Sequence, residues 1–227
     1  MTDRGELKTQ KAPHPASTRR SQAAPGRRQS NKLDKLNRIK AAARQLFVSQ
    51  GFDDTTVREI ATRAGVGLGT LFSYSLNKRD LLFLLGNDSL DEVAEKAGAG
   101  LDPKARLADN LRGIFGAHYA FFASEPVLAR LVLREMTFYD SGAQAQRFRV
   151  IRQRVIDHVA GALALAIASG EIAGREDIAF DAWVLFAIYQ VELRAWLAAC
   201  APDCAPDLAM GLQRLERALK VCIGGLR

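Results

Sequence analysis

From Leu36 onwards, apolar side chains recur at every third or fourth position in one segment after another. The first of these segments contains Leu36, Ile39, Ala43, Leu46 and Phe47, and Gly51 follows it. This spacing places the apolar side chains on one face of a helix, and a glycine just beyond the last turn often ends a helix. The pattern therefore predicts a helix that ends before Gly51.

Capping residues and apolar spacing predict more helices along the chain. Thr56 and Glu59 form a T-x-x-E capping box before a helix that runs through Ala64. Asp102 and Pro103 are interpreted as the N-cap and first residue of another helix. The remaining helices are expected at 68–75, 77–97, 126–139, 143–169, 177–199 and 207–223. No run of alternating β-type residues and no internal repeat occurs, so the expected fold class is all-α.

Residues 1–31 differ in composition from the rest of the chain. They hold three of the seven prolines, many Ser, Gln and Arg residues and almost no large apolar side chain. Such a segment cannot bury enough apolar surface to offset its chain entropy, so we expect a disordered tail.

The net charge of +7 is concentrated at the N-terminal end. Residues 1–32 hold eight basic and two acidic side chains, a net charge of +6, and residues 33–80 hold eight and five, a net charge of +3. The remainder therefore carries −2. This distribution is typical of a chain whose N-terminal end meets a polyanion, although a solvated basic tail without a partner stays open as an alternative.

Cysteine and histidine usage gives no indication of a metal site or another cofactor. Cys200, Cys204 and Cys222 are an odd number, which favours reduced thiols in a cytoplasmic protein. The histidines are scattered, and no second Cys/His pair accompanies Cys200 and Cys204. We also find no paired carboxylates and no nucleophile–base constellation, so we do not expect an enzyme.

No membrane partner is expected either. The most apolar run, 182–199, is interrupted by Gln190, Glu192 and Arg194, which favours a buried helix over a membrane span. The first residues lack the apolar core of a secretion signal.

The segment "REIATRAGVGLGTLFSYS" (58–75) places three glycines beside a predicted helix. Each glycine costs about 1 kcal/mol relative to alanine inside a helix. We interpret Gly65 as a turn with positive φ, Gly67 as a helix cap, and Gly69 as a point of close backbone approach to DNA. Residues 56–75 then form a helix-turn-helix motif, whose second helix enters the major groove. A helical hairpin with a glycine-rich connection is the alternative.

Residues 38–82, about a fifth of the chain, resemble the TetR family of bacterial transcriptional repressors. The resemblance is carried by Ala41-Ala42, Leu46-Phe47, Gly51-Phe52, Thr55-Thr56-Val57, Ile60-Ala61, Ala64-Gly65-Val66, Gly69-Thr70-Leu71, Tyr74 and Lys78. It implies a three-helix DNA-binding domain at 32–80 and a larger helical domain at 81–227 that binds an effector and dimerises.

The resemblance also implies a DNA contact for eight residues. Thr56 and Arg58 would contact a phosphate or a base edge, Gly69, Thr70, Phe72 and Ser73 would face the groove, and Tyr74 and Lys78 would bind phosphates. The sequence departs from the family at three positions. Phe72 stands where tyrosine is usual, Ser75 where an aromatic residue is usual, and Leu76 where proline is frequent. We expect Phe72 to lose a phosphate hydrogen bond and to keep apolar contact with a thymine methyl group.

The predicted reading helix has few groups that identify bases, because it contains no Arg, Asn or Gln. Much of the affinity is therefore expected to come from Arg58 and from the basic tail, which carries Arg19, Arg20, Arg27 and Arg28 and which we expect to reach a minor groove. A flexible tail without a DNA contact stays open.

Two predicted helices in the larger domain are rich in aromatic residues. The candidate effector pocket comprises Phe115, His118, Tyr119, Phe122, Trp183, Phe186, Tyr189 and Gln190. Each of these aromatic residues can equally be plain core. The resemblance implies a small organic effector and does not identify it.

The last two predicted helices are the expected dimer interface. Helix 177–199 is apolar around most of its circumference, and helix 207–223 carries a stripe of Leu208, Leu212, Leu215, Leu219 and Cys222. If these two helices pack against the same two helices of a second subunit related by two-fold symmetry, the four form a four-helix bundle.

The sequence thus predicts a homodimeric repressor that binds double-stranded DNA at a roughly palindromic operator and is released by a small organic effector. The alternatives are an architectural DNA-binding protein without a ligand and a family member that activates transcription.

Overall fold

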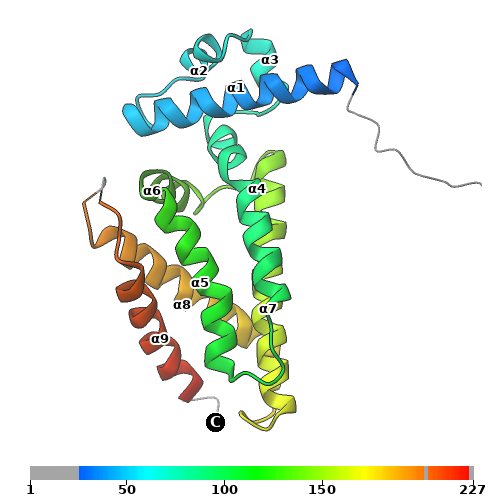
Figure 1. Cartoon of the computed structure of the whole chain (residues 1–227), viewed down its shortest axis with the longest axis vertical. Helices are drawn as coiled ribbons and strands as arrows, with labels where there is room; N and C mark the ends of the chain where they lie inside the picture. The colour runs from blue at the N-terminus through cyan, green and yellow to red at the C-terminus, as the bar shows by residue number, and fades with distance from the viewer. Residues whose placement is uncertain (1–25, 202–203, 225–227) are drawn as a thin grey trace, which may run out of the picture.

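The computed structural model describes residues 26–201 and 204–224, which form helices and connections without any strand. The expected all-α fold class is confirmed. Figure 1 labels the helices in chain order. They are α1 (Arg27–Ser49), α2 (Val57–Ala64), α3 (Leu68–Phe72), α4 (Lys78–Ala99), α5 (Leu107–Ser124), α6 (Pro126–Glu135), α7 (Ala143–Ala168), α8 (Ile178–Ala198) and α9 (Leu208–Gly224).

Helices α1, α2 and α3 form a small unit at one end of the molecule. The long helix α1 crosses this end, with α2 and α3 on its outer side and the other helices on its inner side (Figure 1). The unit buries the apolar faces that the sequence predicts, including Ile39, Phe47, Ile60, Ala61, Ala64 and Leu71. We call α1–α3 the head.

Helices α4–α9 form the larger part, which we call the bundle. Helix α4 runs from beneath the head along α7, and α5 lies against α4, α7 and α9 (Figure 1). Helices α8 and α9 approach closely at Gly211, where an added Cβ would lie 2.6 Å from the indole of Trp196. The same indole donates a hydrogen bond of 2.8 Å to the carbonyl of Asp207, which fixes the start of α9.

The sequence prediction places the end of the disordered tail at residue 31, and this boundary is wrong. Helix α1 begins at Arg27, so residues 27–31 are helical, while residues 1–25 lie outside the described part of the chain. The segment after Pro25 is rich in Arg, Gln and Lys, which favour helix.

Three other predicted boundaries shift in the structure. Helix α3 ends at Phe72 instead of 75, and α6 ends at Glu135 instead of 139. Helix α5 begins at Leu107, and the expected start at Asp102 is wrong. The Asp102 carboxylate accepts from the amide of Lys104 in a local turn, and Glu171 accepts from the amide of Leu107 at 2.8 Å. A side chain distant in sequence therefore caps α5, which local patterns do not reveal.

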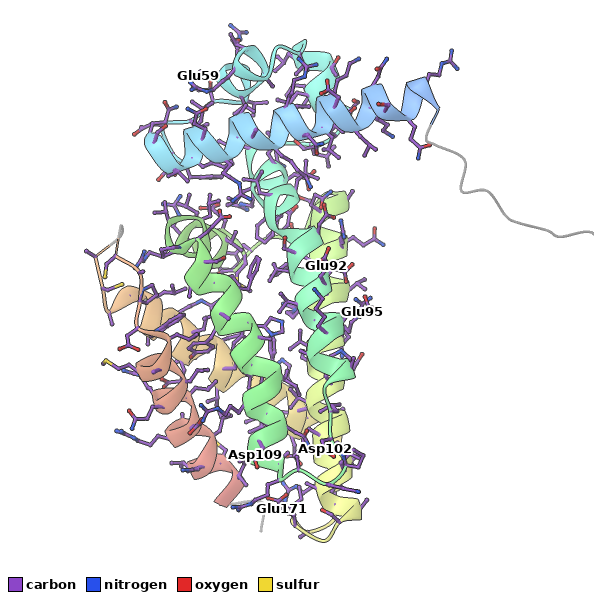
Figure 2. The ribbon with its side chains drawn as sticks, in the orientation of Figure 1. Glu59, Glu92, Glu95, Asp102, Asp109 and Glu171 are labelled. Atoms are coloured by element: carbon purple, nitrogen blue, oxygen red, sulfur yellow. The ribbon has the colours of Figure 1, made fainter. Side chains whose placement is uncertain are left out.

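The end of the bundle farthest from the head carries both acidic and basic side chains. Figure 2 shows Asp102, Asp109 and Glu171 there. Glu171 forms an ion pair with Arg106. Within residues 26–201 and 204–224, every helix is too short or too polar to cross a lipid bilayer. In the same ranges, no three His, Cys, Asp or Glu side chains are grouped to hold a metal ion.

Candidate DNA-binding face and effector cavities

The turn between α2 and α3 is built as the sequence predicts. The amide of Glu59 donates to Oγ1 of Thr56 at 3.2 Å, and the amide of Thr56 donates to the Glu59 carboxylate at 2.8 Å. The Thr56 hydroxyl also donates to the Glu59 carboxylate at 2.8 Å, and the two hydrogen bonds that this carboxylate accepts from the hydroxyl and the amide of Thr56 lower the pKa of Glu59. Gly65 ends α2 with φ 62° and ψ 41°, in the left-handed region that favours glycine, and Gly67 is the N-cap of α3.

The outer surface of α3 is open. An added Cβ at Gly69 would meet no atom within 4 Å, and the ring of Phe72 is 46% exposed. Ser73 is exposed beside it and donates from Oγ to the carbonyl of Thr70 at 2.6 Å. Three of the four residues expected to face the groove therefore lie on α3, and Ser73 is its C-cap. Thr70 is the most enclosed of the four.

Two of the predicted phosphate ligands already bind backbone atoms. The hydroxyl of Tyr74 donates to the carbonyl of Lys32 in α1 at 3.1 Å. Nζ of Lys78 donates to the carbonyls of Phe52 and Asp53 at 2.6 and 3.0 Å and lies over the Phe52 ring. Both side chains hold the head together in this arrangement.

The basic residues expected to add affinity lie apart from each other. Arg58 and Thr56 are exposed at the N-terminal end of α2, and the Arg58 guanidinium has no ion-pair partner among the described residues. Arg28 is exposed in the first turn of α1, which also contains Arg27. Arg19 and Arg20 lie outside the described residues.

Ion pairs connect the head to the bundle. Arg44 of α1 pairs with Glu125 at the start of α6. Lys40 of α1 donates to Asp88 of α4 at 2.7 Å, an interaction that lowers the pKa of Asp88. These pairs are partly solvent-exposed, so each contributes only about 0–1 kcal/mol.

A buried carboxylate provides a second connection between head and bundle. Asp80, in the first turn of α4, is 1% exposed. It accepts from the amide of Leu76, which follows α3, at 3.0 Å and from the hydroxyl of Tyr139, which follows α6, at 2.6 Å. The amide of Gln144, in the first turn of α7, donates to it at 3.2 Å. We call this group the Asp80 junction.

Two neighbouring cavities lie inside the bundle. The first, of about 60 Å³, lies between α4, α5 and α6 and reaches the Arg44–Glu125 pair. The second, of about 30 Å³, lies between α4, α5, α6, α7 and α8. Leu90, Phe122 and Val132 line both cavities and form the wall between them.

The second cavity brings together five of the eight predicted pocket residues, namely His118, Phe122, Phe186, Tyr189 and Gln190. Phe115 and Tyr119 are fully buried next to Tyr189, with the Phe115 ring stacked on it at 4.6 Å between centroids. Trp183 does not line the cavity: it is 54% exposed and stacks on Phe180. Trp183 and Gln190 are seven residues apart and therefore lie on the same side of α8, but Trp183 is two turns nearer the start of the helix, where it is exposed. Periodicity alone does not show how far along the helix the cavity extends.

His118 is the most enclosed polar group of the second cavity. Its side chain is 3% exposed, and Nδ1 lies 2.8 Å from the carbonyl oxygen of Ile114. Burial lowers the pKa of His118; the hydrogen bond to Ile114 opposes this shift, and nearby His158 adds to it.

The leucine stripe of α9 is also corrected by the structure. Leu215 and Leu219 are buried within the chain, because α9 packs on α5 and α8. The exposed apolar side chains of the last two helices are instead Phe180, Trp183 and Val191 on α8 and Met210 and Val221 on α9.

Comparisons with known proteins agree with this architecture. A sequence profile described as "Bacterial regulatory proteins, tetR family" matches residues 39–85, which cover the C-terminal part of α1, the helix-turn-helix motif and the start of α4. The fatty acid metabolism regulator protein of Bacillus subtilis (strain 168) is 25% identical over 167 residues, which are 73% of this chain and 85% of that protein. The chain belongs to the TetR family.

Solved structures of TetR-family regulators share the whole fold. FadR of Bacillus subtilis, in complex with stearoyl-CoA, has a TM-score of 0.62 at 21% identity, over 84% of this chain and 99% of that one. Thermus thermophilus FadR, a TetR-family transcriptional repressor in complex with lauroyl-CoA, has a TM-score of 0.60 at 24% identity, over 85% and 95%. As a TetR-family member, the chain is a DNA-binding transcriptional regulator with an N-terminal helix-turn-helix unit and a larger helical part.

Two of the three departures from the TetR family pattern, Ser75 and Leu76, fall at the connection between α3 and α4. Ser75 is buried, where its hydroxyl donates to the carbonyl of Asn77 at 3.3 Å. Leu76 donates its amide to Asp80, and proline has no amide hydrogen to donate. A small residue at 75 and a non-proline residue at 76 therefore fit the Asp80 junction of this member.

Sequence reasoning missed the residues that connect head and cavity. Arg44 and Glu125 carry no motif, because surface arginines and glutamates are common on helices. The first cavity was missed as well, because its lining residues, such as Leu82, Leu85 and Leu128, have the spacing of any helical core. Gly86 could have indicated the first cavity, because it is a glycine in the interior of α4, where no chain reversal requires a glycine.

Proposed function

We propose that the chain represses transcription as a homodimer on a palindromic operator and that a long-chain acyl-CoA thioester releases it. The observation that carries the proposal is the pair of apolar cavities, one of which reaches α1 of the head at Arg44. An effector that fills this space acts directly on the helix that supports the DNA-binding motif.

The open surface of α3 supports the DNA-binding half of the proposal. We propose that Gly69, Thr70, Phe72 and Ser73 face the major groove and that Thr56 and Arg58 contact a phosphate or base edge. Tyr74 and Lys78 reach phosphates only by giving up their backbone partners. The basic first turn of α1 and the segment before it add electrostatic affinity, so the tail at 1–31 and the DNA-binding domain at 32–80 act together.

The exposed apolar face of α8 and α9 supports the homodimer. Phe180 and Trp183 are each more than half exposed on α8, as are Met210 and Val221 on α9. Large apolar side chains gathered on two neighbouring helices typically mark an interface. A two-fold pairing of these helices would place two heads on one side of the dimer, as a palindromic operator requires.

The identity of the effector class is inferred from the relatives. The fatty acid metabolism regulator matches most of this chain, and two structures of the same fold hold stearoyl-CoA and lauroyl-CoA. The apolar lining of both cavities suits a hydrocarbon chain. In this proposal, residues 81–227 bind the effector and form the dimer. A repressor acts where the chromosome lies, in the cytoplasm, and an odd number of cysteines fits that reducing compartment.

Effector binding requires the bundle to open. The first cavity has about 60 Å³, whereas a site that encloses a drug-sized molecule has about 300 Å³ or more. A long acyl chain therefore displaces Phe122, which separates the cavities, and moves α4 and α6 apart. Both helices contact α1, so the same movement changes the position of the head. Release follows because the effector binds the displaced arrangement better.

Gly86 allows a direct test of this mechanism. Gly86 lines the first cavity, and an added Cβ would come no closer to another side chain than 4.0 Å, at Leu90. We expect Gly86→Leu to fill the cavity, retain operator binding and lose release by stearoyl-CoA or lauroyl-CoA. Gly86→Ala, the matched control, leaves most of the cavity free and keeps release.

The measurement is fluorescence anisotropy of the purified protein with DNA that flanks its own gene, with and without each thioester. DNA binding that no acyl-CoA or other organic compound changes would favour an architectural protein. Failure of Gly86→Leu to reduce release would place the effector outside the first cavity. A reporter assay in the presence of the effector separates repression from activation, because the two signs of regulation give opposite changes in transcription.

A further inference from the structure

The second cavity contains two buried polar atoms without a hydrogen-bond partner among the described residues. They are Nε2 of His118 and Oε1 of Gln190. Both residues line the cavity together with apolar side chains such as Phe122 and Phe186. A buried polar atom left unpaired is unfavourable, so such atoms in a binding cavity indicate a polar group on the molecule that binds there.

The other nitrogen of His118 determines what kind of group is needed. A carbonyl oxygen can only accept, so the Nδ1 atom that lies 2.8 Å from the Ile114 carbonyl carries the hydrogen. Because burial lowers the pKa of His118, the ring is neutral at pH 7 and has one hydrogen on its nitrogens. Nε2 is therefore an acceptor, and it requires a donor from the cavity.

Gln190 is compatible with the same donor. Its side-chain amide can present either its oxygen or its NH₂ group to the cavity by rotation about its last bond. A hydroxyl group both donates and accepts, so it can donate to His118 and meet either orientation of Gln190. The methylene groups of a plain acyl chain can do neither.

The outer side of the second cavity has a different character. Arg152 of α7 lines it and is exposed, and its guanidinium has no ion-pair partner in the described ranges. An anionic part of a ligand would be attracted there, while the hydrocarbon part extends toward His118. The cavity is therefore basic at its outer side, apolar along its length and hydrogen-bond accepting at its buried polar group.

We propose that the effector of this chain carries a hydroxyl group on its hydrocarbon part, and that this hydroxyl donates a hydrogen bond to Nε2 of His118. The inference rests on the proposed effector-binding function and narrows the ligand class from acyl thioesters in general to hydroxylated ones. The cavity of about 30 Å³ has room for an ordered water, and the hydroxyl takes the place of that water when the bundle opens.

Pairs of acyl-CoA thioesters test the inference. The two members of a pair have equal chain length, and one carries a hydroxyl beside the thioester, in mid-chain or at the terminal carbon. Titration calorimetry with the full-length protein measures each affinity. We expect one hydroxylated thioester to bind about tenfold more tightly than its plain counterpart, as a buried hydrogen bond to a neutral partner allows.

His118→Phe is the decisive variant, because it keeps an aromatic ring and removes the acceptor. We expect it to abolish the preference for the hydroxylated thioester while operator binding is retained. His158→Phe is the matched control: His158 also has an unpaired buried Nε2 but does not line the cavity, so the preference should persist. Equal affinities within every pair for the wild-type protein, or a preference that survives in His118→Phe, would overturn the inference.

A parallel series of free fatty acids with and without the hydroxyl separates this inference from the proposed function. Binding of both members of each thioester pair with equal affinity would leave the effector class intact and refute the hydroxyl. If no thioester binds but the free acids show a preference that depends on His118, the thioester class is wrong and the hydroxyl inference stands. Lack of a preference in both series refutes the inference.

Discussion

The head and the bundle are built from the same element, the amphipathic helix, but they differ in how they treat buried polar atoms. In the head, buried Thr55 donates from Oγ1 to the carbonyl of Gly51 at 2.6 Å, and the described head residues leave no buried side-chain polar atom unpaired. The described residues of the bundle leave five such atoms, on Asn87, His118, Tyr119, His158 and Gln190. The head is thus complete in itself, whereas the bundle keeps unused hydrogen-bonding capacity in its core.

The same contrast appears in packing. The head encloses Phe47, Ile60 and Leu71 completely, and its turn is fixed by a capping box and a left-handed glycine. The bundle contains two cavities separated by Phe122 and exposes apolar side chains on α8 and α9. A rigid reading unit and a bundle that can open are what a ligand-controlled DNA-binding protein requires.

The largest expected effect comes from breaking the head alone. Leu71→Ala removes a fully buried side chain from α3, and we expect it to lower the free energy of unfolding of the head by about 2–5 kcal/mol. Operator binding should be lost at temperatures where the bundle still binds effector. Differential scanning calorimetry and effector titration measure both parts, with the more exposed Leu68→Ala as control. A single transition that shifts as a whole would show that head and bundle unfold as one unit.

An intermediate effect is expected at the joint between the two parts. Glu125→Gln removes the ion pair with Arg44, which lies at the edge of the first cavity. Because exposed pairs contribute about 0–1 kcal/mol, we expect the effector concentration for half-release to fall by up to about fivefold. Anisotropy titration measures this value. Glu95→Gln is the matched control, since Glu95 lies on the outer side of α4 (Figure 2) and has no ion pair in the described ranges. An unchanged or higher half-release concentration would contradict this role of the pair.

The smallest effect is expected on the outer surface of the head. Phe72→Tyr adds a hydroxyl to a ring that is 46% exposed on α3. We expect DNA affinity to rise about two- to tenfold through one new phosphate hydrogen bond, with no change in thermal stability. Anisotropy with operator DNA measures the change, and Phe72→Leu reports the contribution of the ring itself. Equal affinity of Phe72→Tyr and the wild-type protein would mean that no phosphate lies near this ring.

The sequence was most informative where structure is determined locally. The capping box of Thr56 and Glu59, the left-handed Gly65 and the N-cap Gly67 are all encoded within twelve residues, and each was predicted. The start of α5 was missed because its cap, Glu171, is distant in sequence. The direction of the α9 leucine stripe was missed for the same reason: periodicity shows that Leu215 and Leu219 share a face but does not show which neighbour that face meets.

The candidate functional residues show the same difference between features determined locally and features that depend on residues distant in sequence. Residues of the DNA-binding face could be nominated because they are consecutive in a short motif, and their contacts remain predictions. Five of the pocket residues do line one cavity: three were nominated as aromatic residues and His118 and Gln190 as polar groups, while Trp183 does not line it. Two partners of Asp80, Tyr139 and Gln144, are 59 and 64 residues away in sequence, so only the folded chain reveals the Asp80 junction.

The Asp80 junction has a consequence for how the regulator responds to its surroundings. Surface ion pairs weaken as ionic strength rises, but hydrogen bonds to a carboxylate that is 1% exposed are largely shielded from dissolved ions. A displacement that starts at α6 can thus pass through Tyr139 to the segment that carries α3, even in a cell under osmotic stress. The response to the effector would then persist at salt concentrations that change the affinity for DNA.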